Sequence, residues 1–74
     1  MFLFVDLEAG LLFASMAQGM HDHERRSQLR RKAQTALDAV TRFLPRVEMS
    51  NDSRAAVLHG LDTLTNEIGK IPPT

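Results

Sequence analysis

The middle of the chain carries the feature that most restricts how it folds. Its apolar residues recur at intervals of three and four positions: Leu29, Ala33, Ala36, Leu37, Val40 and Leu44. This spacing places them on one face of an α-helix, whereas polar residues such as Arg31 and Asp38 fall on the opposite face. Pro45 lacks an amide hydrogen and disfavours helical geometry at the residue before it. We therefore predict an amphipathic helix over residues 24–44.

Two further segments have the same period, and no segment alternates in the way of a half-buried strand. The first, residues 3–18, places Leu3, Leu7, Gly10, Ala14 and Ala17 along one stripe. The second, residues 52–69, repeats through Ala55, Val57, Leu58, Leu61, Leu64 and Ile68. The predicted fold class is all-α, a small three-helix antiparallel bundle in which an αα-hairpin is joined by a third helix.

Residues typical of turns and helix ends separate the three segments. Gly19 is a candidate left-handed terminator, and Asp22 or His23 precedes the second helix. Ser50, Asn51 and Asp52 form a helix-starting run. Gly69 and the prolines that follow it predict a stop and a flexible tail over residues 70–74. The whole chain, residues 1–74, is predicted to be a single domain.

The first helical pair resembles a tetratricopeptide-type helical hairpin over about forty residues. The small residues Ala14, Ala17, Ala33 and Ala36 and the closing sequence Phe43, Leu44, Pro45 carry this resemblance. The chain departs from the family pattern because it has no Trp, no Tyr and no second copy of the motif. The resemblance implies the geometry of a close-packed hairpin and carries no function over to this chain.

The first helix has more apolar residues than two neighbouring helices need. A chain of 74 residues has a core that gives only about 3 to 5 kcal/mol, and without Cys it has no disulfide to add to it. We therefore predict a homodimer with two-fold symmetry. Its candidate interface residues are Phe2, Phe4, Val5, Leu11, Leu12 and Met16. The alternatives are that these residues wrap a monomeric core or that the first four residues fray.

The start of the second helix carries a concentrated positive charge. Five of the nine cationic residues form a basic cluster with no acid among them: Arg25, Arg26, Arg30, Arg31 and Lys32. The net charge is zero, so this cluster carries +5 and the other residues together carry −5. Cations at a helix N-terminus oppose the helix dipole, so folding alone does not explain them. On a helical projection Arg30 and Arg31 point outward, and Arg25 and Arg26 lie nearer the apolar edge.

Three interpretations of the basic cluster stay open. The first is a solvated helix start that is partly neutralised by acids nearby in the sequence, namely Asp6, Glu8, Asp22 and Glu24. The second is a contact site for an acidic protein surface or for a carboxylate ligand. The third is a site for nucleic-acid phosphate, although phosphate-binding proteins are usually strongly basic overall.

Signatures of a metal site, of catalysis and of membrane insertion are weak. The run His21, Asp22, His23, Glu24 has suitable ligand atoms, but neighbouring residues in a turn rarely converge on one ion. The serines lie in no nucleophile motif, and we predict no enzyme, metal site or cofactor. The apolar N-terminal stretch lacks a basic start and contains Asp6 and Glu8, which disfavours a secretory signal and a membrane span. The predicted location is cytoplasmic.

The function predicted from these features is a non-enzymatic protein–protein interaction or assembly module. It would form a homodimer through the first helix and bind an acidic protein surface through the basic cluster. The alternative is a small nucleic-acid-binding or regulatory protein whose arginines contact phosphates, with affinity that falls steeply as salt rises. No polar recognition helix of the helix-turn-helix type is evident, which favours the assembly module.

Overall fold

The computed structural model describes residues 3–72 as three long helices joined by short connections. Their bounds are α1, Leu3–Gln18; α2, His23–Phe43; and α3, Asn51–Gly69, with a short 3-10 helix η1, Leu44–Arg46, after α2. The predicted helix ranges differ from these bounds by no more than one residue at either end. The structure is all-α, as predicted from the apolar spacing.

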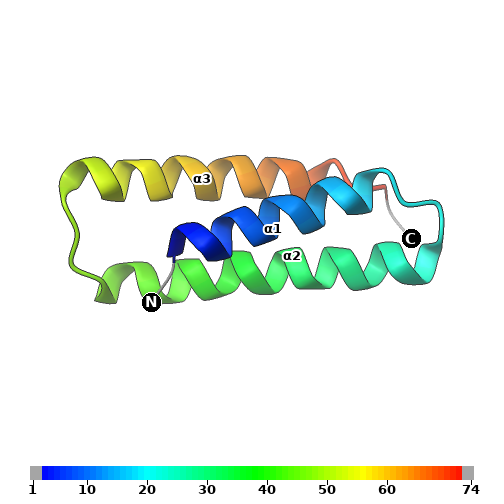
Figure 1. The fold of residues 1–74 in the computed structure, drawn as a ribbon, viewed down its shortest axis with the longest axis horizontal. Coiled ribbons are helices and arrows are strands. Elements are labelled where there is room, and N and C mark those ends of the chain that lie inside the picture. The colour runs from blue at the N-terminus through cyan, green and yellow to red at the C-terminus, as the bar shows by residue number, and fades with distance from the viewer. Residues whose placement is uncertain (1–2, 73–74) are drawn as a thin grey trace.

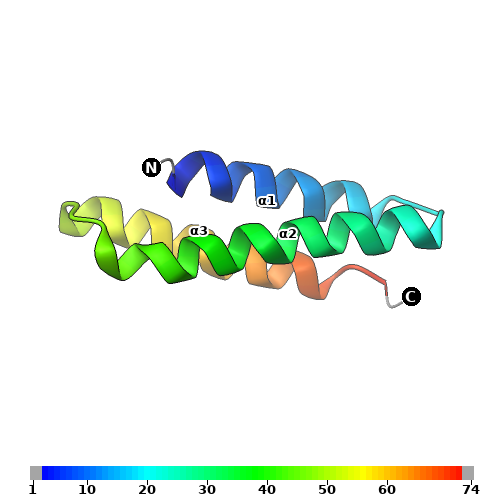
Figure 2. The ribbon, with the colours of Figure 1, turned by 90° about the horizontal axis from the view of Figure 1, so that it is seen from below.

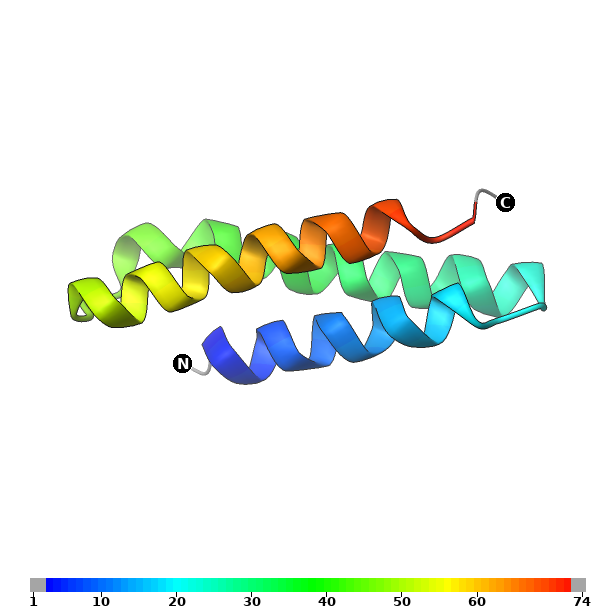
Figure 3. The same ribbon diagram turned by 90° about the horizontal axis from the view of Figure 1, so that it is seen from above.

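The helices form an elongated bundle of 41 × 17 × 15 Å (Figure 1). The chain reverses direction twice, so α2 runs antiparallel to both α1 and α3. Each helix contacts the other two, and α1 lies against both of its neighbours (Figures 2 and 3). The predicted three-helix antiparallel bundle is confirmed for one copy of the chain.

The helix starts follow from local hydrogen bonding. The Asp22 carboxylate accepts from the amides of Glu24 at 2.9 Å and Arg25 at 3.5 Å. The Ser50 hydroxyl accepts from the Ser53 amide at 3.1 Å. These bonds satisfy amides that have no partner inside the first turn of a helix. Asp22, and not His23, is therefore the cap of α2.

The end of α1 differs from the prediction. Among residues 3–72 no glycine has a positive φ, so Gly19 is not a left-handed terminator. The Gly19 amide instead donates to the Met16 carbonyl at 3.2 Å, and the Met20 amide donates to Ala17 at the same distance. Tightened i to i−3 bonds of this kind end a helix without left-handed geometry.

Small residues dominate the centre of the bundle. Six core residues are essentially inaccessible to solvent: Ala14, Ala17, Ala33, Val40, Val57 and Leu64. A Cβ atom placed on Gly10 of α1 would lie 2.9 Å from Leu64 Cδ2 and 3.0 Å from Ala36 Cβ. Gly10 thus lets α1 approach α2 and α3 at once, which larger side chains would prevent.

The chain beyond α3 does not behave as the free tail predicted from residue 70. Ile71 is only 3% exposed, and its amide donates to the Ile68 carbonyl at 3.1 Å. Its own carbonyl accepts from Arg30 Nη2 at 2.8 Å. Burial of a large apolar side chain and a charge-assisted hydrogen bond hold this segment against the bundle. Residues 73–74 of the predicted tail lie outside the described residues.

Candidate functional site

Two members of the basic cluster bind the chain's own backbone, and the other three are exposed. Arg26 is buried, at 9% exposure: Nη1 donates to the Met20 carbonyl at 3.4 Å, and Nη2 donates to His23 Nδ1 at 2.9 Å. Arg30 Nη2 donates to the carbonyls of Ile71 at 2.8 Å and Pro72 at 3.2 Å. The sequence prediction that Arg30 points outward is therefore wrong. Both side chains hold the chain's own backbone at this end of the bundle.

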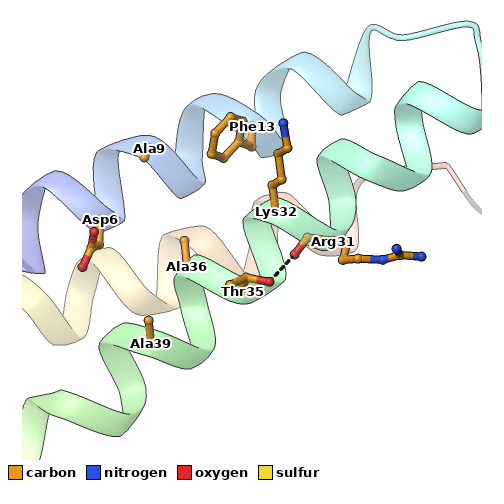
Figure 4. Close-up of a pocket in the computed structure, with 8 residues that line it drawn as sticks. All are labelled: Asp6, Ala9, Phe13, Arg31, Lys32, Thr35, Ala36 and Ala39. Atoms are coloured by element: carbon orange, nitrogen blue, oxygen red, sulfur yellow. Dashed lines mark hydrogen bonds between the residues drawn. The ribbon is translucent and has the colours of Figure 1, made fainter.

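The other three members of the cluster, Arg25, Arg31 and Lys32, are exposed. The Lys32 ammonium lies 5.6 Å from the centre of the Phe13 ring, within the range of a cation–π interaction. Arg31 extends away from α1 (Figure 4). These three side chains are the most exposed members of the cluster.

The acids near the basic cluster in the sequence form no direct ion pair with its exposed members among residues 3–72. Within residues 3–72 the one ion pair joins Lys70 Nζ to Glu67 Oε1 at 3.1 Å. The Gln18 amide also donates to Glu67 Oε2 at 2.6 Å, and these contacts lower the pKa of Glu67, the bond from Gln18 more than that from Lys70. No exposed cation of the cluster pairs with an acid of residues 3–72. No ion pair with an exposed cation of the cluster is made, within residues 3–72, by the acids predicted to neutralise it, which are Asp6, Glu8, Asp22 and Glu24.

The predicted dimer interface residues lie mainly on one surface of α1. Phe4, Val5, Leu12 and Met16 are between 45% and 59% exposed. Leu11 differs because it is half-buried and packs against the core. Phe2 lies outside the described residues. Four large apolar side chains on one helix are thus left uncovered by the rest of the protomer.

An open groove of about 520 Å³ between α1 and α2 adjoins this surface (Figure 4). Its residues are Asp6, Ala9 and Phe13 from α1 and Arg31, Lys32, Thr35, Ala36 and Ala39 from α2. The alanines form a shallow apolar floor. Asp6 and Lys32 lie toward opposite ends of the groove, so one end is acidic and the other is basic (Figure 4).

One exposed apolar residue was not singled out from the sequence. Leu58 of α3 is 52% exposed, although it belongs to the apolar repeat from which that helix is predicted. Its neighbour Val57 is fully buried. Consecutive residues lie 100° apart on a helix, so the stripe through Val57 and Leu64 could have placed Leu58 at its edge.

The described residues offer little for metal binding or membrane insertion. Between residues 3 and 72 no three His, Asp or Glu side chains are grouped so as to hold a metal ion. Nor is any helix in that part of the chain both long and apolar enough to span a membrane. Comparison of the chain with protein-family models, with curated proteins and with solved structures gives no match.

Proposed function

We propose that this chain is a non-enzymatic helical assembly module that forms a homodimer through α1. The observation that carries the proposal is the exposed apolar face of α1, defined by Phe4, Val5, Leu12 and Met16. An apolar face on a small helical protein is a common site of protein association, because covering it removes apolar surface from water. A protomer with a small core gains stability when it shares that surface with a second copy.

The exposed cations suit a second part of the same function, contact with acidic groups. Lys32 lines the groove beside the α1 face, and Arg25 lines a smaller hollow of about 260 Å³ with Met16 and Met20. Apolar and cationic side chains are therefore adjacent on one side of the molecule. A partner surface that combines apolar residues with carboxylates would complement it.

Nucleic-acid binding is the less favoured alternative. Two of the five cations predicted for phosphate contact, Arg26 and Arg30, are engaged by the chain's own carbonyl groups. The three that are exposed give few phosphate contacts, and affinity rises with the number of phosphates neutralised. Binding to DNA or RNA at low ionic strength that weakens steeply with salt would revive this alternative.

The α1 assignment is tested by a matched pair of leucine substitutions. Leu12 and Leu58 are 59% and 52% exposed, on α1 and α3 respectively. We expect Leu12→Glu to convert the dimer to a monomer in sedimentation equilibrium, because it places a charge in the apolar interface. We expect Leu58→Glu to leave the dimer intact. Loss of the dimer with Leu58→Glu alone would assign assembly to α3 and contradict the proposal.

A further inference from the structure

The exposed side of α1 repeats with the spacing of a helix-packing seam. Val5, Ala9, Leu12 and Met16 follow one another at intervals of four, three and four residues. The buried stripe of α1 has the same alternation of fours and threes, from Leu3 through Leu7, Gly10 and Ala14 to Ala17. This spacing is how one helix presents a row of side chains to another helix packed along it. Thus α1 has a buried seam toward α2 and α3 and an exposed seam with no helix on it in the protomer.

The spacing of the exposed seam is the same from either end of the helix. In an antiparallel pair of α1 helices, the spacing of four, three and four sets Val5 opposite Met16 and Ala9 opposite Leu12. A small side chain then faces a large one at the centre, and a medium one faces a long flexible one outside it. Facing positions that alternate small and large interdigitate well, and a two-fold interface requires this self-complementarity.

The charges of the groove have the same two-fold character. Asp6 and Phe13 are seven residues apart on α1, about 10 Å along the helix axis, and Lys32 lies over Phe13. With Val5 opposite Met16, Phe13 of an antiparallel second copy lies level with Glu8 of the first. Its Lys32 then lies within about one helical turn of Asp6 along the helix axis, and the two-fold axis places the reverse pair in the same way. Within the protomer no ion pair joins Asp6 to Lys32.

From this complementarity we infer that the occupant of the groove is a second copy of the chain. The two grooves face each other, α1 runs antiparallel to α1 of the second copy, and the four helices α1 and α2 of both copies form a four-helix bundle. Two reciprocal Asp6–Lys32 pairs fix the antiparallel register. This inference rests on the proposed function, since it specifies the geometry of the α1 homodimer.

Exchange of the two charges provides the test. Asp6→Lys and Lys32→Asp are studied separately and as an equimolar mixture by sedimentation equilibrium. In a homodimer of either variant, like charges face each other at both contacts between positions 6 and 32. We expect dimerisation of each variant alone to weaken about tenfold or more. In a dimer of one Asp6→Lys copy and one Lys32→Asp copy, an acid again faces a base at both contacts. We therefore expect the mixture to form a heterodimer of near-original affinity. Asp62→Lys, which makes the same charge change at an exposed site on α3, is the control and should dimerise normally.

The outcomes separate the inference from the proposed function. If the unmodified chain is dimeric but mixing the two variants fails to restore dimerisation, or each variant dimerises normally alone, the antiparallel groove arrangement is wrong and the α1 homodimer stands. If the unmodified chain does not dimerise, the proposed function fails and the inference with it. Circular dichroism of each variant at low concentration checks that helix content is unchanged, and restoration on mixing is itself evidence that both variants are folded.

Discussion

The two faces of α1 differ in how their apolar side chains are covered within the protomer. The buried face includes Gly10, Ala14 and Ala17, which have little or no side chain. The exposed face carries the large apolar side chains of Phe4, Leu12 and Met16. The small residues let the helices of one protomer pack closely, and the large ones are left with no covering in that protomer. In the proposed homodimer, α1 would have two sets of neighbours, one within the protomer and one in the second copy.

The largest expected difference in the free energy of unfolding is between leucine-to-alanine substitutions on the two faces of α1. Leu7 is 4% exposed and lies over Gly60 of α3, where an added Cβ would come within 2.9 Å of Leu7 Cδ1. We expect Leu7→Ala to lower the free energy of unfolding by about 2–5 kcal/mol because it leaves a cavity in the core. Leu12→Ala should change it by less than about 0.5 kcal/mol.

Chemical denaturation at a concentration where the chain is monomeric measures both values. Under that condition a cost for Leu12→Ala as large as that for Leu7→Ala would mean that Leu12 packs within the protomer. The distinction between the two faces would then be wrong.

A smaller effect is expected where glycine permits close packing on the buried face. Gly10→Ala places its Cβ against Leu64 and Ala36, and we expect a loss of about 1–3 kcal/mol from overpacking. Gly69, the last residue of α3, has no atom within 4 Å of an added Cβ and does not have a positive φ. We expect Gly69→Ala to stabilise the chain by about 0.5 kcal/mol, because alanine loses less backbone entropy on folding. Thermal unfolding of both variants gives the comparison, and a stabilising Gly10→Ala would contradict the close approach of the three helices.

The smallest expected difference within a pair of variants is between two neighbouring residues of α2. Arg30 bonds the carbonyls of Ile71 and Pro72, whereas Arg31 is exposed. We expect Arg30→Met to cost about 1 kcal/mol through loss of these hydrogen bonds, and Arg31→Met to be nearly neutral. Hydrogen exchange at the Ile71 amide should be faster in the Arg30 variant only. Equal exchange in the two variants would show that Arg30 does not hold the end of the chain.

The helices and their antiparallel order could be predicted from the sequence because each depends on local features. Apolar period, the caps at Asp22 and Ser50 and the break at Pro45 all act within a few residues of one another. The burial of Gly10 beside Leu7 also follows from their common stripe. These signals do not depend on where the other helices lie.

The direction of Arg30 could not be predicted in the same way. A helical projection places Arg30 outside the apolar stripe of α2, but it does not show that the chain returns to that side after α3. Ile71 lies beyond Gly69 and directly before two prolines, where local signals favour a free end. Only the packing of α3 brings Ile71 back into contact with α2. The groove is likewise a product of α1 and α2 together, so its opposite charges could not be located from either segment alone.

The most direct test of the central claim is sedimentation equilibrium of the unmodified chain over a range of concentrations. We expect a species of twice the 8.3 kDa chain mass that dissociates reversibly on dilution. A folded, helical species that stays at 8.3 kDa up to the highest concentration would contradict it. The exposed face of α1 would then be a surface that this chain does not use to bind itself.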